Sequence, residues 1–443
     1  MNFRLQLSRT RTTTEGFAEA ALIRSDGTAL CDVDLQTSML RVLPTLQPAA
    51  IDLLLVASSI YCLDKLVPRS SSVDAWTREL SLQVPVSDET SWNSVKGILE
   101  ECISFLSGDL WEFRFVRQAE SPFRATQIPI PCRADVVSLF SGGLDSLVGA
   151  IDWLNANPAM PIVLVGHHDG QMAGPLADQY RLLGELKASY QHPISPIFMR
   201  VGHKNESVER PEITLRSRSL LFVALGILSA SSIGPNVQLL VPENGTIALN
   251  IPLTPSRRGS CSTRTTHPYY LSLLSRVLAG VGLSNRISNP LEGKTKGEAV
   301  SQCLDHHVLE HAAPLSVSCA KRGHRSHFTH RSAKACGRCL PCIYRRAALH
   351  TMNWDNELYG DDVCIGDVDV LHDMQKANDW RACLSFLKRD PSTTNISSLL
   401  LANGRLEVAR LPQYAALVKR AMNEIRLLLR DKASADIKRM AGI

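Results

Sequence analysis

The chain has 443 residues, of which 44% are hydrophobic and 21% charged, and its formal net charge is +5. This length favours two or three domains, and the apolar fraction can bury a large core. No apolar run approaches the length needed to span a membrane and the first residues lack the apolar core of a signal peptide, so we expect a soluble, cytoplasmic protein. The 12 cysteines follow no spacing typical of secreted proteins, which argues against a disulfide-stabilised fold.

Residues 1–130 are predicted to form an N-terminal α+β module. An apolar helix is expected over Pro48 to Lys65, and alternating apolar residues predict strands over Glu79 to Val86 and Leu110 to Arg117. Between these strands we expect a helix from Ser91, which would cap it, to Leu106. None of these residues has catalytic spacing, so we interpret the module as a docking site for a partner or as a lid. The proline-rich stretch from Ser121 to Pro131 is predicted to be a linker.

A glycine-rich segment follows an apolar run and opens a helix-like run: Ser141, Gly142, Gly143, Leu144, Asp145 and Ser146. A strand that leads into a glycine-rich turn at a helix N-terminus favours anion binding. The glycines let the backbone approach a phosphate, and the free N–H groups and the helix dipole favour negative charge. The Lys-Ser/Thr pair of a Walker A loop is absent. The alternative interpretation is a plain glycine turn between a strand and a helix.

Residues 133–310 alternate strands and helices, which predicts an α/β domain with a parallel sheet and right-handed crossovers. We expect strands over residues 134–140, 161–165, 194–201 and 237–241, and helices over residues 146–156, 176–190 and 213–230. His167 and His168 follow the second strand near the edge where such sheets bind ligands, where a polar lining is more common than an acid-base role. Glu243 and Asn244 follow the fourth strand at the same edge.

Four cysteines, Cys319, Cys336, Cys339 and Cys342, have a spacing that predicts a closed tetrahedral Zn²⁺ site in a module of residues 311–350. Closed four-cysteine sites are structural rather than catalytic. Two alternatives stay open. His324, His327 or His330 can replace Cys319 as the fourth ligand, and an iron–sulfur cluster also uses four cysteines.

Between Cys319 and Arg346 the sequence has eight basic residues and no acidic one: Lys321, Arg322, Arg325, Arg331, Lys334, Arg338, Arg345 and Arg346. Such a stripe can contact nucleic-acid phosphates, but Phe328 and Tyr344 are its only aromatic residues for base stacking. We therefore favour cations that offset the zinc tetrathiolate charge, or a protein partner, over a nucleic acid. Residues 351–443 are predicted to be helical, with apolar residues at helical spacing between Tyr414 and Leu429.

The SGGxDS loop and the late cysteine cluster, in this order, resemble the 7-cyano-7-deazaguanine synthases, the QueC-like branch of the PP-loop ATP pyrophosphatases. The segment from Arg216 to Phe222 is similar to the family's R-N-x-x-F helix, with Ser219 in place of Asn. The segment from Asn289 to Lys296 is similar to its P-L…K-x-E segment. The resemblance covers residues 133 to 350, and the outline of the whole chain resembles the QueC-like component of Qat-type anti-phage defence systems.

The resemblance implies a PP-loop fold and an ATP-dependent ligase that forms a C–N bond through an adenylate. In that family the loop, here Ser141 to Ser146, binds ATP. Asp145 is then the ligand for Mg²⁺, and Arg218 with Lys294 or Lys296 neutralises the departing pyrophosphate. The implied substrate is 7-carboxy-7-deazaguanine, bound near Glu243, Asn244, Arg264 and His267. The acyl group passes to ammonia, or to an amine of a partner protein from the same defence system.

The resemblance fails after the fourth strand. The synthases have a Y-P-D-C-R segment there, whereas this chain has an unrelated stretch from Leu253 to Pro268, in which Cys261 and Arg264 are the nearest counterparts. The acceptor of the acyl group is therefore open. Two other functions remain as alternatives: another PP-loop reaction, such as tRNA amidation or a thiolation that uses Cys261, and a scaffold that binds nucleotide without catalysis.

Overall fold

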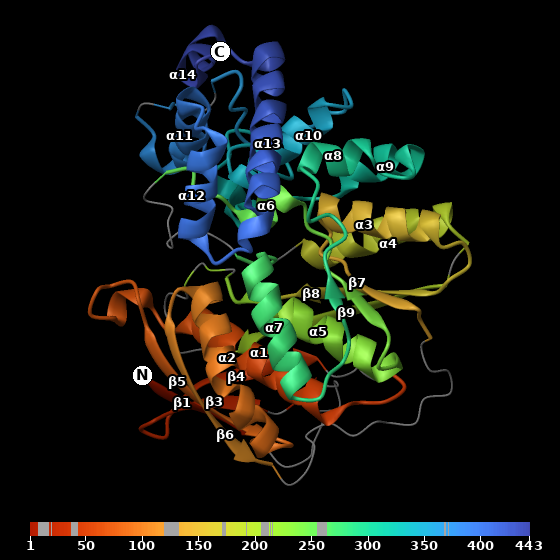
Figure 1. The fold of residues 1–443 in the computed structure, drawn as a ribbon, viewed down its shortest axis with the longest axis vertical. Coiled ribbons are helices and arrows are strands. Elements are labelled where there is room, and N and C mark those ends of the chain that lie inside the picture. The colour runs from red at the N-terminus through yellow and green to blue at the C-terminus, as the bar shows by residue number, and fades with distance from the viewer. Residues whose placement is uncertain are drawn as a thin grey trace.

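A computed structural model describes the chain except residues 8–16, 19, 37–42, 119–132, 171–173, 192, 205–211, 213, 215, 255–263, 367–368 and 371. The predicted linker from Ser121 to Pro131 and the candidate Cys261 lie outside the described residues. Figure 1 shows a lower part built around a sheet and an upper part of helices, drawn in blue, that contains the C-terminus.

The lower part contains an 11-stranded sheet in the order β11-β10-β7-β8-β9-β4-β3-β1-β5-β6, with β2 paired to β4. From β11 to β9 all neighbouring strands are parallel, which confirms the predicted α/β character. The strands are β1 Asn2–Leu7, β2 Phe17–Ala18, β3 Ala20–Arg24, β4 Ala29–Gln36, β5 Glu79–Val86, β6 Leu110–Arg117, β7 Val136–Leu139, β8 Ile162–His168, β9 Ile194–Lys204, β10 Gln238–Leu240 and β11 Ile287–Ser288.

The helices expected in the sheet-containing part are present, but α5 begins at Arg218 rather than at residue 213, α7 was not expected, and one cap differs. Asp88, not Ser91, caps α2, because the Asp88 carboxylate accepts the backbone N–H groups of Thr90 and Ser91. The α-helices are α1 Pro48–Leu66, α2 Glu89–Ser107, α3 Leu144–Ala156, α4 Pro175–Ser189, α5 Arg218–Ile233, α6 Gly245–Leu249, α7 Pro268–Gly280, α8 Lys296–Ser301, α9 His306–Ala312, α10 Leu340–His350, α11 Met374–Arg389, α12 Thr393–Asn403, α13 Leu411–Lys432 and α14 Ala435–Ala441.

The N-terminal strands and the parallel strands belong to one continuous sheet. The junction is antiparallel, with Asp32 to Leu35 of β4 paired to Val201 to Lys204 of β9. One hydrophobic cluster extends across it, from Phe3 in β1 to Leu283 after α7. Helix α1 is apolar on nearly all sides, so it is buried between the sheet and its neighbours, where it contacts α5. Residues 1–118 therefore share their core with the parallel sheet.

The C-terminal residues form a second core of helices, which confirms the predicted helical character. Trp380 of α11 and Tyr414 of α13 are buried in it, together with Leu249 and Ile251 near α6. Helix α13 places its apolar face inward, as the spacing from Tyr414 to Leu429 predicts. None of the helices in the described ranges combines the length and apolar character needed to cross a membrane.

Candidate functional site

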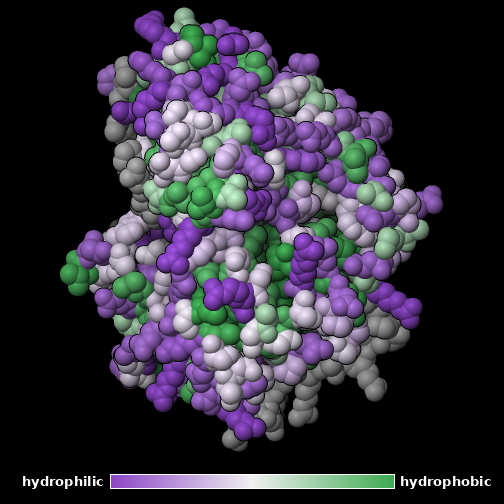
Figure 2. All heavy atoms as spheres, in the orientation of Figure 1, coloured by the Kyte–Doolittle hydropathy of each residue, from purple (hydrophilic) through white to green (hydrophobic). Residues whose placement is uncertain are grey.

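A cavity of about 300 Å³ lies where the parallel strands β7 and β10 end. Six segments line it: the glycine-rich loop, the start of α5, the residues after β10, the residues before α7, the start of α8 and the cysteine module. Its polar lining consists of Ser141, Asp145, Ser146, Arg218, Ser219, Glu243, Thr265, Thr266, Lys296 and Ser318. In Figure 2 apolar side chains gather in the middle of the visible face, where the C-terminal helices meet the sheet-containing part.

The glycine-rich loop turns sharply into α3. Gly142 has a φ of +84°, the left-handed region that favours glycine, and its carbonyl accepts the N–H of Val317 at 2.9 Å. Gly143 occupies the N-cap of α3 and provides no capping side chain. The Ser146 hydroxyl donates to the Gly143 carbonyl at 2.9 Å and lies 3.2 Å from the Ser141 hydroxyl. The positive end of the α3 dipole and two hydroxyls thus meet at the cavity wall.

Asp145 is the centre of a buried charged group beside this loop. Its Oδ2 lies 2.5 Å from Lys296 Nζ and accepts a hydrogen bond from Asn244 Nδ2 at 3.1 Å. Its Oδ1 is buried without a hydrogen-bond partner among the described residues. Burial, together with the neighbouring Asp145 charge, raises the pKa of Glu243 well above its usual value. Two carboxyl groups and one ammonium thus face the cavity, with a carboxylate oxygen available to a metal ion.

Arg218, the first residue of α5, supplies a cation without a carboxylate partner among the described residues. Its Nε donates to His167 Nδ1 at 3.1 Å and its Nη2 to the His167 carbonyl at 3.2 Å. His167 Nε2 lies 2.8 Å from the Val201 carbonyl, so the proton belongs on Nε2 and Nδ1 accepts. His167 and His168 do not follow the second strand, as expected, but are the last two residues of β8. Neither lines the cavity, so we assign His167 a supporting role toward Arg218.

Six predicted site residues are not among those that line the cavity: Gly142, Leu144, Asn244, Arg264, His267 and Lys294. Lys294 contributes its backbone carbonyl to the N–H of Gly245, and only Lys296 of the two candidate lysines lines the cavity. The Arg264 guanidinium donates to the Phe105 carbonyl at 2.7 Å and stacks on the Phe105 ring. The His267 side chain caps α7 by accepting the N–H of Tyr269. Thr265 and Thr266, between these two residues, line the cavity instead.

Replacing Arg264 by Ala is therefore expected to lower stability rather than substrate affinity. The variant loses one hydrogen bond and one cation–π contact, which together contribute about 1–3 kcal/mol. Urea unfolding should detect this loss, with Arg331→Ala on the exposed surface of the cysteine module as the control. A large fall in affinity for a cavity ligand without a change in the free energy of unfolding would contradict this assignment.

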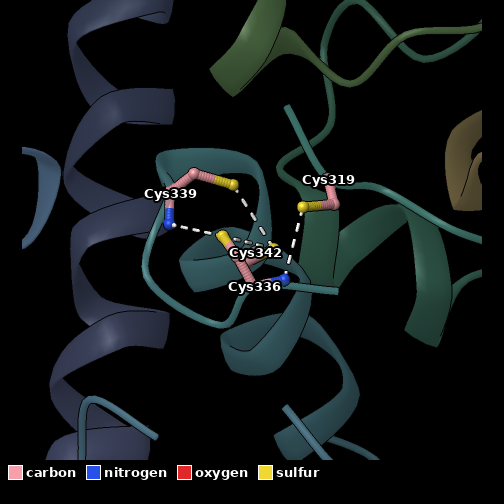
Figure 3. A group of neighbouring side chains, drawn as sticks. All are labelled: Cys319, Cys336, Cys339 and Cys342. Atoms are coloured by element: carbon pink, nitrogen blue, oxygen red, sulfur yellow. Dashed lines mark hydrogen bonds between the residues drawn. The ribbon is translucent and has the colours of Figure 1, made fainter. Parts of the chain in front are cut away.

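The four predicted cysteine ligands converge, as Figure 3 shows. Their sulfur atoms all lie within 4.8 Å of one another, a spacing compatible with zinc, and His324, His327 and His330 are not in the group. Backbone N–H groups of Lys321, Cys336 and Cys339 donate to the sulfurs, as thiolates require. Gly337 allows the tight turn, since its φ is +77° and a Cβ there would lie 2.3 Å from the Asp361 carbonyl.

Half of the predicted basic stripe is paired with carboxylates. Buried Arg338 pairs with Asp361, and buried Arg345 with Glu357. Arg346 pairs with both Asp355 and Asp362, and Arg322 pairs with Asp178. These four arginines stabilise the module by ion pairs, so the stripe does not present a continuous basic surface to a nucleic acid.

The cysteine module also holds the glycine-rich loop. In addition to the bond from Val317 to Gly142, the Leu144 N–H donates to the Ser318 hydroxyl at 3.3 Å. Arg322 of the module pairs with Asp178, whose Cβ lies against Gly142. No local pattern predicts these contacts, because Leu144 and Ser318 are 174 residues apart.

Helix α13 supports Lys296 from the other side, which the sequence did not predict. Glu424 accepts hydrogen bonds from the Thr295 hydroxyl and, at 3.1 Å, from the Gly297 N–H, at the first turn of α8. Burial raises the pKa of Glu424 to about 7. Because Glu424 and Thr295 are 129 residues apart, no local pattern marks this pair.

Two buried histidines predict an acid-sensitive fold. Burial, together with the charge of a neighbouring arginine, lowers the pKa of His167 and of His267 to about 3 from 6.5. The unfolded chain binds these protons below about pH 6.5 and the folded protein does not. Stability should therefore fall as the pH drops from 6.5 toward 3, by ~1.4 kcal/mol per pH unit per histidine. Urea unfolding at several pH values measures this slope. His267→Asn, which keeps a capping oxygen, should reduce it, and an unchanged slope would contradict the assignment.

Comparison with known proteins leaves the family open: no protein-family model matches the chain, and neither does any curated protein.

Proposed function

We propose that the cavity binds ATP and that the protein is an adenylating ATP pyrophosphatase of the QueC-like type, with a PP-loop fold. The observation that carries the proposal is the meeting of the α3 N-terminus, an arginine without a carboxylate partner among the described residues and a buried Asp–Lys pair around one cavity. Such a set of donors and cations suits a polyphosphate. The motif order SGGxDS and then four cysteines supports the same family.

The residues present fit the two metal ions of that family. The Oδ1 of Asp145, which has no hydrogen-bond partner among the described residues, offers a hard oxygen ligand for Mg²⁺, which when bound would neutralise phosphate charge. The four convergent cysteines suit a closed, structural Zn²⁺ site. In this assignment Lys296 pairs with Asp145 in the free protein and also neutralises phosphate charge when ATP is bound. Arg218 stabilises the negative charge that develops on the departing pyrophosphate.

The proposed reaction uses the substrate's own carboxylate as nucleophile, and by family resemblance the substrate is 7-carboxy-7-deazaguanine. A carboxylate oxygen attacks the α-phosphorus of ATP, the bond to the β-phosphate oxygen breaks, and pyrophosphate leaves. The acyl-adenylate then reacts with an amine: a C–N bond forms, AMP leaves with the attacking oxygen, and the amine loses a proton. With ammonia the product is an amide, which a second ATP can activate for loss of water to the nitrile.

We propose further that the amine belongs either to ammonia or to a partner protein, in an anti-phage defence system in the cytoplasm. The support is the outline of the chain and the altered segment after the fourth strand, which in the synthases helps to hold the substrate. Mass spectrometry of the small molecules and of any co-purified protein, after incubation with ATP and 7-carboxy-7-deazaguanine, distinguishes the two acceptors.

Pyrophosphate release tests the proposal. Wild-type protein should release pyrophosphate from ATP only when 7-carboxy-7-deazaguanine is present, and Arg218→Ala should lower kcat by about 10²–10³-fold, the loss typical of one removed transition-state contact. The exposed Arg331→Ala serves as the control. Release of ADP and phosphate, or no turnover of ATP with this substrate, would contradict the proposed function.

A further inference from the structure

The last two turns of α1 connect the N-terminal region to the ligand edge of the parallel sheet. Asp64 and Lys65 follow Tyr61 by three and four residues, so both lie on the same side of the helix as Tyr61. The Tyr61 hydroxyl donates to Asp169 Oδ2 at 2.9 Å, and Lys65 forms an ion pair with the same carboxylate, directly after β8. This helix lies outside the segment that resembles the synthases.

Asp64 caps the helix that carries Arg218. Its Oδ2 accepts hydrogen bonds from the Ser217 hydroxyl at 2.8 Å and from the Ser217 N–H at 3.3 Å, and Ser217 is the N-cap of α5. The Thr214 hydroxyl donates to the same oxygen at 3.1 Å. A carboxylate at this position satisfies polar groups at the helix start and interacts favourably with its dipole.

The Asp64 carboxylate is itself held in place. Its Oδ1 accepts from Arg78 Nη2 at 2.7 Å, and Arg78 is fully buried and also pairs with Asp109. Arg69 pairs with Asp109 as well, which gives two buried arginines and two buried aspartates. Such a charge-balanced and hydrogen-bonded network has few alternative arrangements. It is therefore rigid enough to hold the first residues of α5 in one position.

A second set of contacts connects α1 to the same arginine. The Tyr61 ring meets the His167 ring edge to face at 5.4 Å, and Phe222 packs on His167 in the same way at 5.5 Å. His167 accepts the hydrogen bond from Arg218 Nε. The N-terminal region therefore contacts the surroundings of Arg218 in two ways. Asp64 binds Ser217, the residue before Arg218, and Tyr61 packs on His167, which accepts a hydrogen bond from the guanidinium.

We propose that the N-terminal region positions Arg218 for the anion in the cavity, with Asp64, Ser217 and Tyr61 as the positioning residues. This inference rests on the proposed function, because it assumes that the cavity binds ATP. It adds a role to the interpretation of residues 1–130 as a docking site for a partner or as a lid.

A double-mutant cycle with Ser217→Ala and Arg218→Ala tests the inference. Ser229→Ala is the matched control, since Ser229 is a buried serine of the same helix whose hydroxyl donates only within α5. Binding of Mg·ATP is measured by calorimetry, kcat and KM by pyrophosphate release, and Tm by thermal unfolding, all on the full chain. Ser217→Thr, which keeps the hydroxyl, is the conservative variant for rescue.

Ser217→Ala should weaken ATP binding three- to tenfold with a Tm close to that of Ser229→Ala, and Ser217→Thr should restore the affinity. In the Arg218→Ala background the Ser217→Ala change should have no further effect, because Ser217 acts through Arg218. Additive losses, or unchanged binding in Ser217→Ala, would overturn the inference while leaving the proposed function intact. If Ser217→Ala lowers the Tm more than Ser229→Ala does, the cycle is repeated with Tyr61→Phe in place of Ser217→Ala. The same two results, no further effect or additive losses in the Arg218→Ala background, then support or overturn the inference. Wild-type protein that binds no ATP would instead overturn the proposed function.

Discussion

Replacing Cys339 by Ser is expected to release the metal ion and to unfold the module of residues 311–350. Cys339 is fully buried, and its sulfur lies 3.3 Å from that of Cys342 in a group of four possible ligands. Zinc contributes about 10–16 kcal/mol to the folding of small zinc peptides, so the loss of one thiolate ligand should destabilise the module strongly. The loss should extend to the cavity, because Val317 and Ser318 hold the glycine-rich loop.

Elemental analysis, thermal unfolding and ATP binding measure the three effects in one preparation. Cys303→Ser is the control, since Cys303 is a buried cysteine outside the group. Wild-type protein should contain one zinc ion per chain and the control should retain it. Wild-type protein without zinc, or a Cys339→Ser variant that keeps a full equivalent of metal, would refute the assignment.

The second large effect is expected for Asp145→Asn, which should lower the rate of pyrophosphate release by about 10²–10³-fold. The substitution removes the carboxylate that we assign to Mg²⁺ but keeps an oxygen for the hydrogen bond from Asn244. The substitution also takes the charged partner from Lys296, so thermal unfolding of the variant is measured together with its rate. Removing the whole side chain would be less informative, because Asp145 is buried and paired.

Asp152→Asn is the matched control for this variant. Asp152 lies on the same helix, and its carboxylate accepts the N–H of Leu304, away from the cavity lining. The control should keep the wild-type rate. An Asp145→Asn variant with the wild-type rate and the wild-type dependence on Mg²⁺ would remove Asp145 from the site.

Local sequence patterns predicted four of the five parallel strands, β7 to β10, together with the glycine-rich loop and the cysteine group, but not the two-residue β11. Each depends on residues that are close in sequence or on alternation within one strand. The strand pairing between β4 and β9 was not predicted, because periodicity reports which face of a strand is buried but not which strand lies beside it. For the same reason the contact between Glu424 and Thr295, 129 residues apart, was not predicted.

Two interpretations changed for specific physical reasons. The basic stripe extends from Cys319 to Arg346 and has no acidic residue within it. Its carboxylate partners Asp355, Glu357 and Asp361 follow shortly after it in the sequence, so they neutralise arginines that looked unpaired. Arg264 and His267 follow the fourth strand, as a substrate-binding segment would, but they contact Phe105 of α2. Nothing in the sequence indicates that α2, from the N-terminal region, lies beside them.

The most direct test of the central claim is to follow an oxygen atom from the substrate. With 7-carboxy-7-deazaguanine labelled with ¹⁸O in the carboxylate, an acyl-adenylate mechanism transfers one labelled oxygen to AMP when the amine displaces it, and pyrophosphate stays unlabelled. Mass spectrometry of the nucleotide products measures the transfer. We expect AMP that carries one ¹⁸O from wild-type protein. AMP without label, or cleavage of ATP to ADP and phosphate, would contradict adenylation of the carboxylate in this cavity.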